Sequence, residues 1–448
     1  MADETWVPVV GGVLGLACLW MALRAGRKRR FLDDTPTSKA RGVFIGDVEL
    51  KGAVECDRPL TSHLAEVRCV WYRWSVAEHW RRVVRETYTD EKGRVRTRTR
   101  VESGTTVVAS GEDSTPFFLR DDTGAVLVRP QGAEIEGAVV LSTTVGPGHR
   151  LYYGKGPRGA VMDSTFQRDF LETAIATARP VYLVGRARER KDAVAPEIAA
   201  DKRAEMYLIS VRSEEDISRS HAFGHWLWFA LGLACAGGTF AWYEQTLGFD
   251  PDRQLRGYAL LATACLFAWL LGWAWMVHDS LVGLRQRVRQ GLGNLEVQLK
   301  RRHDLVPRLA AIVSGLSQHE QSVQESLAAL RAQASIPPGA ERGGGARLEA
   351  LAPRLVALRE SHPRLVAQEG FLELQRQLSD TETRIALART YYNDIASAYN
   401  ARLLVVPDRY AAALARLRPE PLFAAEGFER AAVAVEFQQD PPGSDREA

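Results

Sequence analysis

The chain has 448 residues, enough for two or three domains that each bury a core. Its 58 basic and 55 acidic residues nearly balance, which argues against a chain that binds nucleic acid along its length. The five cysteines form no CxxC pair, so neither a thiolate zinc site nor a redox motif is indicated, and we expect no cofactor or metal. Reduced thiols are favoured over a disulfide between Cys56 and Cys69, although the sequence leaves their pairing open.

Three charge-free apolar stretches, Trp6–Leu23, Trp226–Tyr243 and Tyr258–Val277, are long enough to cross a bilayer as helices. We predict transmembrane helices at 6–25, 224–244 and 257–277, and the last two carry Trp and Tyr near their ends, as interfacial anchors do. Two buried core helices are the alternative for that pair, but core helices rarely run this long without a polar face. Residues 1–5 are acidic and lack the basic start of a signal peptide, so an uncleaved span is favoured over a cleaved signal, and these residues are predicted to form a short extracytoplasmic N-terminus.

Basic residues beside the spans predict the orientation. No Lys or Arg precedes the first span, whereas the end of the span and the juxtamembrane linker 26–39 that follows are basic. The basic residues at this end of the span are Arg24, Arg27, Lys28, Arg29 and Arg30. We therefore expect the N-terminus outside and both soluble regions, 40–215 and 280–437, in the cytoplasm.

The region 40–215 alternates apolar and polar residues in short runs separated by turn signals, which is typical of strands and hairpins. The predicted strands include Val67–Val76, Thr105–Ala109, Phe117–Arg120, Ala125–Val128 and Val181–Gly185. By composition, Ser164–Ala178 is predicted to form one helix on the sheet. The region is therefore expected to be α+β and mostly β.

Two motifs in this region invite functional readings. Arginines at spacing two predict a basic strand face, which is either a solvated hairpin face or a surface for nucleic acid or lipid headgroups. These arginines are Arg94, Arg96, Arg98 and Arg100. Gly154, Gly156 and Gly159 match GxGxxG, but Pro157 lies inside the motif and no βαβ pattern surrounds it, so a dinucleotide site is disfavoured.

The runs KGAVECDRPLTSHLAEVRCVWYRWSVAEHWRR, STPFFLRDDTGAVLVRP and GHRLYYGKG resemble the GIDE domain, the middle domain of mitochondrial RING-type ubiquitin ligases. The resemblance covers about residues 40–215 and implies a membrane-adjacent recognition module. The RING domain in which those ligases carry their zinc and their catalysis has no counterpart here, because no cysteine follows Cys265.

After the third span, apolar residues recur at steps of three and four, as on one face of a helix, which predicts a helical bundle over 280–437. One stripe runs from Leu281 to Leu316 and another from Phe371 to Tyr399. Ser335–Gly345 is a predicted loop, and Asp408–Leu417 is a short predicted helix with Asp408 as its cap. With Pro307 as a local kink, one helix is expected to run from the membrane into the bundle. The tail 438–448 is predicted to be disordered.

The segments GNLEVQLKRRHDLVPRLAAIV and FLELQRQLSDTETRIALARTYYNDIASAYNARLLVVP, with PLFAAEGFERAAVAVEF, resemble the LemA family. That resemblance implies a bacterial, membrane-attached helical bundle and supplies no catalytic residue. Its polar positions here are read as helix-to-helix partners or a docking surface. With the hairpin arginines, the candidate interaction residues are His303, Asp304, Glu382, Arg384 and Asn393.

These features predict a multidomain membrane protein with three transmembrane helices, a GIDE-like domain and an all-α bundle. The expected function is a non-catalytic scaffold at the cytoplasmic face of a bacterial inner membrane. Its expected partners are the lipid bilayer and an unidentified protein, without nucleic acid, and homo-oligomerisation stays open. The alternatives are a ubiquitin-ligase-like protein and an accessory subunit of a transporter or channel. The spans carry no ionisable residue of the kind that transport usually requires.

Overall fold

The structure is a computed structural model that describes residues 6–89, 95–190, 195–247, 251–316 and 369–423. It divides into two compact units, residues 1–295 with 383–420 and residues 296–382 with 421–448. Several predicted segments lie outside the described residues: the N-terminal segment 1–5, the Ser335–Gly345 loop, the tail 438–448 and most of the last LemA-like motif.

Among the residues that the structure describes, two helices are long and apolar enough to cross a membrane, judged by length and composition. They are α1 (Trp6–Asp33), over Val9–Asp33, and α4 (Pro251–Leu316), over Arg256–Leu309. The predicted second span lies in α3 (Glu214–Leu247), which is not one of the two, so the prediction of three spans is met only in part. The glycines, threonine and tryptophans of α3 lower the mean hydropathy of this helix.

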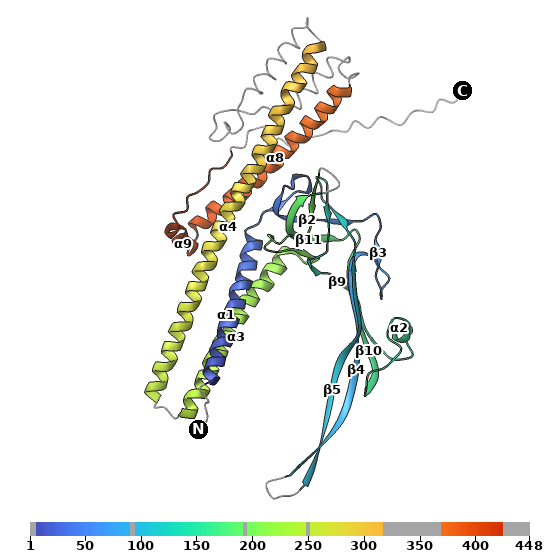
Figure 1. The fold of residues 1–448 in the computed structure, drawn as a ribbon, viewed down its shortest axis with the longest axis vertical. Coiled ribbons are helices and arrows are strands. Elements are labelled where there is room, and N and C mark those ends of the chain that lie inside the picture. Colours follow the sequence, from blue (N-terminus) through green and yellow to red (C-terminus); the bar gives the residue numbers. More distant parts are fainter. Residues whose placement is uncertain (1–5, 90–94, 191–194, 248–250, 317–368, 424–448) are drawn as a thin grey trace, which may run out of the picture. The chain divides into compact units, whose positions relative to one another are not determined.

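Helices α1 and α3 lie side by side and run in opposite directions (Figure 1). Near one end, a Cβ added to Gly11 would lie 1.8 Å from Thr239 Oγ1, and one added to Gly15 would lie 3.4 Å from the Ala236 Cβ. Near the other end, His225 Nδ1 donates to the carbonyl of Ala22 at 2.7 Å. Small residues thus allow the two backbones to approach closely.

One sheet of the β-rich region closes on itself. Its strand order is β1-β2-β6-β7-β12-β11-β13-β8, and the antiparallel pairing of β2 with β11 completes a ring of five strands. Apolar side chains such as Leu50, Leu119 and Leu183 fill the interior. The strands are β1 (Thr37–Ser38), β2 (Gly46–Glu55), β6 (Phe117–Arg120), β7 (Ala125–Val128), β8 (Glu134–Glu136), β11 (Pro180–Glu189), β12 (Pro196–Ile198) and β13 (Leu208–Ser210). A turn of 3₁₀ helix, η1, spans Ala40–Gly42.

The second sheet has the order β3-β4-β10-β9, with β5 paired to β4. Beyond Trp80, β4 pairs only with β5, and the two extend as a long hairpin (Figure 1). The elements are β3 (Leu60–Thr61), β4 (Arg68–Thr89), β5 (Val95–Ser114), β9 (Ala138–Val145), α2 (Arg150–Gly154) and β10 (Ser164–Ala176).

The predicted helix Ser164–Ala178 is wrong, because this segment forms strand β10. Its inward positions alternate as a strand requires, with Arg168, Phe170, Glu172 and Ala174 all buried. Two of these four are charged, so the apolar alternation that marks a strand is hidden in the sequence. The predicted strands Phe117–Arg120 and Ala125–Val128 are confirmed as β6 and β7.

The C-terminal helices follow the predicted stripes. Helix α8 (Glu369–Leu404) buries Phe371, Leu378, Ile385, Tyr392 and Tyr399, and α4 continues unbroken from its apolar part into the LemA-like segment. Helix α9 (Asp408–Leu414) begins as predicted. Asp408 does not cap it, since the N-cap is Pro407 and the buried Asp408 carboxylate binds arginines instead.

Candidate functional site

The predicted polar residues of the helical segment fall into both compact units. In the unit that contains 296–382, Glu382 on α8 forms an ion pair of 3.8 Å with Arg302 on α4, and both side chains are largely buried. His303 is half-buried, with its Nδ1 unbonded among the described residues, and Asp304 is exposed. Helix pairing therefore accounts for Glu382, and the docking role of His303 and Asp304 stays a prediction.

Arg384 and Asn393 lie on the part of α8 that belongs to the other unit, and both are half-buried. Further along, the LemA-like Tyr399 and Asn400 bind main chain. Tyr399 donates to the carbonyl of Arg418 at 3.2 Å, and the Asn400 amide exchanges two hydrogen bonds with the backbone of Glu420. These two residues hold the segment after α9 against α8, which is a structural role.

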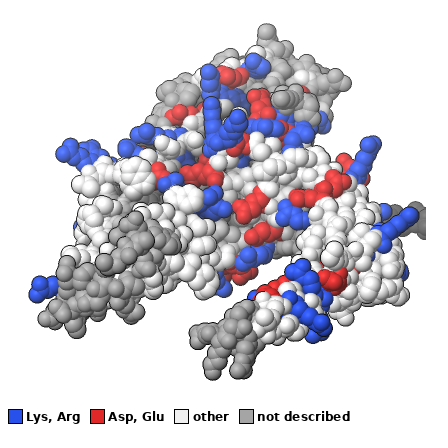
Figure 2. All heavy atoms as spheres, turned by 60° about the horizontal axis from the view of Figure 1, so that its bottom comes forward, with Lys and Arg blue, Asp and Glu red and all other residues white. Residues whose placement is uncertain are grey.

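The hairpin arginines are spread along an exposed strand. Arg98 and Arg100 are exposed on β5, and Arg96 lies in β5 opposite Tyr88, whereas Arg94 lies outside the described residues. Glu102 accepts a hydrogen bond of 3.0 Å from Arg82 and lies 3.8 Å from Arg100. Figure 2 shows charge of both signs on the hairpin beside its grey tip. Acidic residues thus interrupt the predicted basic face, and its role as a binding surface remains a prediction.

The GxGxxG match belongs to a loop that a buried arginine holds. Arg168 on β10 donates to the carbonyls of Tyr152, Pro157 and Gly159 at 2.7–2.9 Å, and to Glu78 on β4 at 3.0 Å. Arg168 and Glu78 are both fully buried. Because the loop carbonyls turn toward the arginine, the glycines serve this turn and offer no phosphate cradle.

Hydrogen bonds hold the Glu78 carboxylate in its ionised form. Burial by itself raises the pKa of Glu78, but the hydrogen bonds from Ser164 and Arg168 and the charge of Arg168 outweigh it and keep this pKa below its usual value. Elsewhere, all five cysteines are free, and burial raises the pKa of the Cys69 thiol to about 11, so that thiol is unreactive at neutral pH.

A cluster of buried charges joins the end of α1 to α4, α8 and α9. We call Arg30, Asp34, Arg287, Arg402 and Asp408 the junction cluster. Arg30 donates to Asp408 at 2.9 Å and 3.2 Å, and Arg402 donates to Asp34 at 2.8 Å. Both carboxylates are at most 4% exposed.

The third arginine of the junction cluster completes the link to α4. Arg287 donates to Thr35 at 2.6 Å and lies 4.1 Å from the centre of the Phe31 ring, while Ser280 donates to Asp34 at 2.9 Å. Residues from four helices thus meet in one largely buried polar network, in which α4 takes part through the hydrogen bonds of Ser280 and Arg287. No local motif indicates this network, because in the sequence Arg30 predicts only the orientation and Asp408 only a helix cap.

The junction cluster has no nucleophile and no donor set for a metal. Within the part of the chain that the structure describes, no three His, Cys, Asp or Glu side chains gather as metal ligands would. Arginines pair with the Asp408 carboxylate, and Arg402 and Ser280 together bond that of Asp34, which suits a structural clasp more than proton transfer.

Comparison with protein families identifies two segments. A model described as the LemA family matches residues 291–437, and the GIDE model, described as E3 ubiquitin ligase, matches residues 85–242. Neither curated proteins nor solved structures include a match to this chain.

The chain therefore combines a GIDE segment with a LemA segment, as the sequence motifs predicted. The GIDE match starts later than the predicted domain at residue 40 and extends through most of α3. The LemA match starts inside α4, within the predicted bundle.

Proposed function

We propose that the chain is a non-catalytic, membrane-anchored scaffold that presents its GIDE and LemA segments to partners at the cytoplasmic face. The observation that carries the proposal is the junction cluster. Its ion pairs tie the C-terminal end of α8 to the basic end of α1, next to the helices that continue from the apolar stretches. A fixed arrangement at a membrane surface raises the effective concentration of two binding surfaces for a shared partner.

The proposal includes three spans, α1, α3 and α4, with the N-terminus outside and the chain in a bacterial inner membrane. Antiparallel packing of α1 and α3 supports it, since residues 37–210 then leave and re-enter the spans at the basic end of α1. The close approach of Gly11 and Gly15 to α3 gives the less apolar α3 a helix partner inside the bilayer.

The test compares single polar changes with loss of the anchored arrangement. His303→Ala, Glu382→Gln and Arg98→Ala should each leave partner recovery by crosslinking from membranes within about twofold of the wild type. Placing the two segments on separate soluble chains should lower recovery about tenfold or more. If His303→Ala or Glu382→Gln alone abolished activity while the variant still folded and still recovered partner normally, the helical segment would contain an active site.

The junction cluster has its own matched pair of variants. Arg402→Gln removes a half-buried partner of Asp34 and Asp408, whereas Arg409→Gln changes the same charge at an exposed position of α9. Under this proposal, the first variant lowers partner recovery and the second does not. Equal effects of the two variants would remove the junction cluster as the basis of the arrangement.

The description of the matching GIDE model favours one other function, a part in ubiquitin-like modification. A transfer assay with the purified chain and a set of conjugating enzymes discriminates the two functions. We expect no transfer above that of a boiled sample, because the chain carries no cysteine after Cys265 from which a RING could be built.

A further inference from the structure

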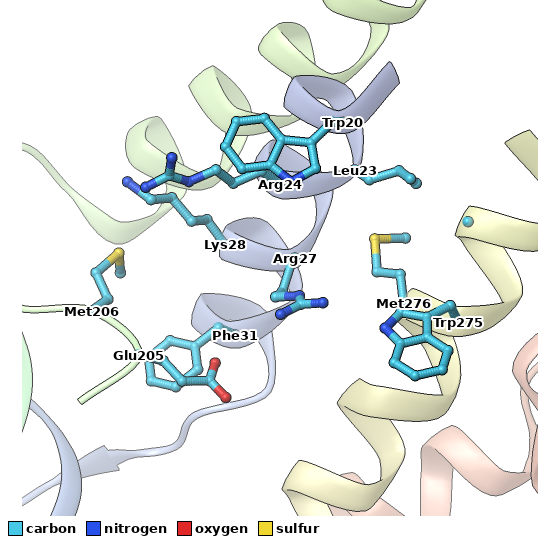
Figure 3. A pocket seen from close by; sticks show the side chains of 11 residues that line it. Trp20, Leu23, Arg24, Arg27, Lys28, Phe31, Glu205, Met206, Trp275 and Met276 are labelled. Atoms are coloured by element: carbon cyan, nitrogen blue, oxygen red, sulfur yellow. The ribbon is translucent and has the colours of Figure 1, made fainter. Parts of the chain in front are cut away.

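A cavity of about 570 Å³ lies between the basic end of α1 and the middle of α4. Its walls carry Arg24, Arg27 and Lys28, which come from little more than one turn of α1 (Figure 3). Its volume is in the range of sites that bind small molecules. All of its lining residues belong to one compact unit.

The cavity is apolar on the side that continues into the spans. Trp20 and Leu23 of α1 line it there, and Figure 3 shows Trp20 beside Arg24, whereas Met276 and Trp275 of α4 lie further from Trp20, nearer Arg27. Tryptophan next to arginine at the end of a hydrophobic stretch is the composition found where a helix meets lipid headgroups. The wall thus changes from apolar to cationic along one face of α1.

The cations of the wall differ in how far they are already neutralised. Arg27 lies 3.4 Å from Asp279, and Lys28 lies 3.3 Å from Glu134. Arg24 is exposed and forms no ion pair or hydrogen bond with any described residue, and its guanidinium lies 5.4 Å from the centre of the Trp20 ring. The acidic wall residue, Glu205, lies beside Phe31 in Figure 3, away from Trp20 and Arg24. An anion would therefore be attracted to the Arg24 side.

We propose that this cavity binds an anionic phospholipid. The headgroup phosphate lies at Arg24 and Arg27, and the upper part of one acyl chain lies along Trp20 and Leu23. Phosphate matches guanidinium through paired hydrogen bonds, and the apolar wall favours a lipid over a free phosphate ion. The inference rests on the membrane placement proposed above, because a lipid reaches the cavity from the bilayer.

The experiment measures lipid retention by the full-length chain in a neutral detergent, using native mass spectrometry with titrated phosphatidylglycerol. We expect phosphatidylglycerol to bind about tenfold or more tightly than phosphatidylcholine. Arg24→Gln should weaken it about fivefold, and Arg24→Gln with Arg27→Gln about tenfold or more. Arg29→Gln is the matched control, because Arg29 is on the same helix, pairs with Asp33 and does not line the cavity.

Each contrary result has a specific meaning. If Arg29→Gln weakened binding as much as Arg24→Gln, attraction would be a general property of the basic helix end and the site would be refuted. Equal binding of phosphatidylcholine, or full competition by millimolar inorganic phosphate, would also overturn a lipid site. Resistance of the chain to alkaline extraction from membranes is measured in parallel. If alkaline treatment extracts the chain, the membrane placement itself is refuted. If the chain resists extraction but shows no preference for phosphatidylglycerol, only this inference is refuted.

Discussion

Arg168 and Glu78 are charged side chains that water does not reach, and each has a full set of partners. The arginine bonds the carboxylate, the carbonyl of Tyr152 in α2 and two carbonyls of the loop that follows, so it joins β10, β4, α2 and that loop in one contact. A buried pair of this kind contributes little relative to apolar residues of the same shape, but removing one partner leaves an uncompensated charge.

Arg168→Met should therefore lower the free energy of unfolding of the β-rich region by about 3–5 kcal/mol, because Glu78 and the three carbonyls lose their donor. Thermal unfolding of the detergent-solubilised chain, followed by its β-sheet circular dichroism, measures the effect. Arg82→Met is the control: Arg82 pairs with Glu102 at an exposed position, where the loss should stay below about 1 kcal/mol. Similar losses in both variants would contradict the role assigned to Arg168.

Glu49 on β2 is a buried carboxyl that should make stability depend on pH. Burial raises its pKa to about 7, against the lowering effect of hydrogen bonds from Thr37 and Tyr182 and of the nearby Lys51, while Glu214 raises it further. The folded chain thus holds a proton between about pH 4.5 and 7 that the unfolded chain has lost. The free energy of unfolding should fall by a few kcal/mol as pH rises through this window and then level off.

The variant that tests this dependence is Glu49→Gln, which cannot ionise. The stability of the variant minus that of the wild type should be larger at pH 8 than at pH 5, because only the wild type loses stability between these pH values. Melting temperatures of both chains at the two pH values decide the matter. A difference between the chains that is the same at both pH values would show that Glu49 keeps an ordinary pKa.

At the scale of elements, the packing of α1 against α3 depends on which of two adjacent glycines faces the partner helix. A Cβ at Gly11 would overlap Thr239, whereas a Cβ at Gly12 would meet nothing within 4 Å. Gly11→Leu should therefore separate the helices and lower the melting temperature of the solubilised chain by several degrees, and Gly12→Leu should have little effect. Equal effects would mean that helix propensity, not the α1–α3 contact, controls the result.

The sequence predicts an element well where the element's own residue pattern determines its structure, and poorly where residues distant in the sequence determine it. Strands β6 and β7 and the buried stripes of α4 and α8 follow from apolar periodicity, which each segment carries by itself. Strand β10 was mispredicted because Arg168 and Glu172 occupy inward positions that normally are apolar. The junction cluster and the basic cavity were missed, because their residues come together only through tertiary packing.

At the scale of the whole molecule, the proposed orientation puts both recognised segments on the side of Arg24–Arg30. Cysteines placed singly at Gly93 and Gly344, in a chain without its five native cysteines, should resist an impermeant thiol reagent in intact cells. A cysteine at Gly248 should react. Labelling at Gly93 or Gly344 before lysis would contradict this orientation, and labelling of all three after lysis controls for reactivity.

The junction cluster also bears on the order of events during synthesis. Arg30 and its partner Asp408 are 378 residues apart, so the ribosome must make all the residues between them before the network can close. At about 5–20 residues per second, that delay is on the order of 20–75 s. Throughout this interval, Arg30 and Asp34 at the end of α1 lack their late partners. Translation arrest or truncation before residue 402 would leave Arg30 without its carboxylate and Asp34 without its arginine, a mark by which chaperones and proteases distinguish an unfinished chain from a longer one.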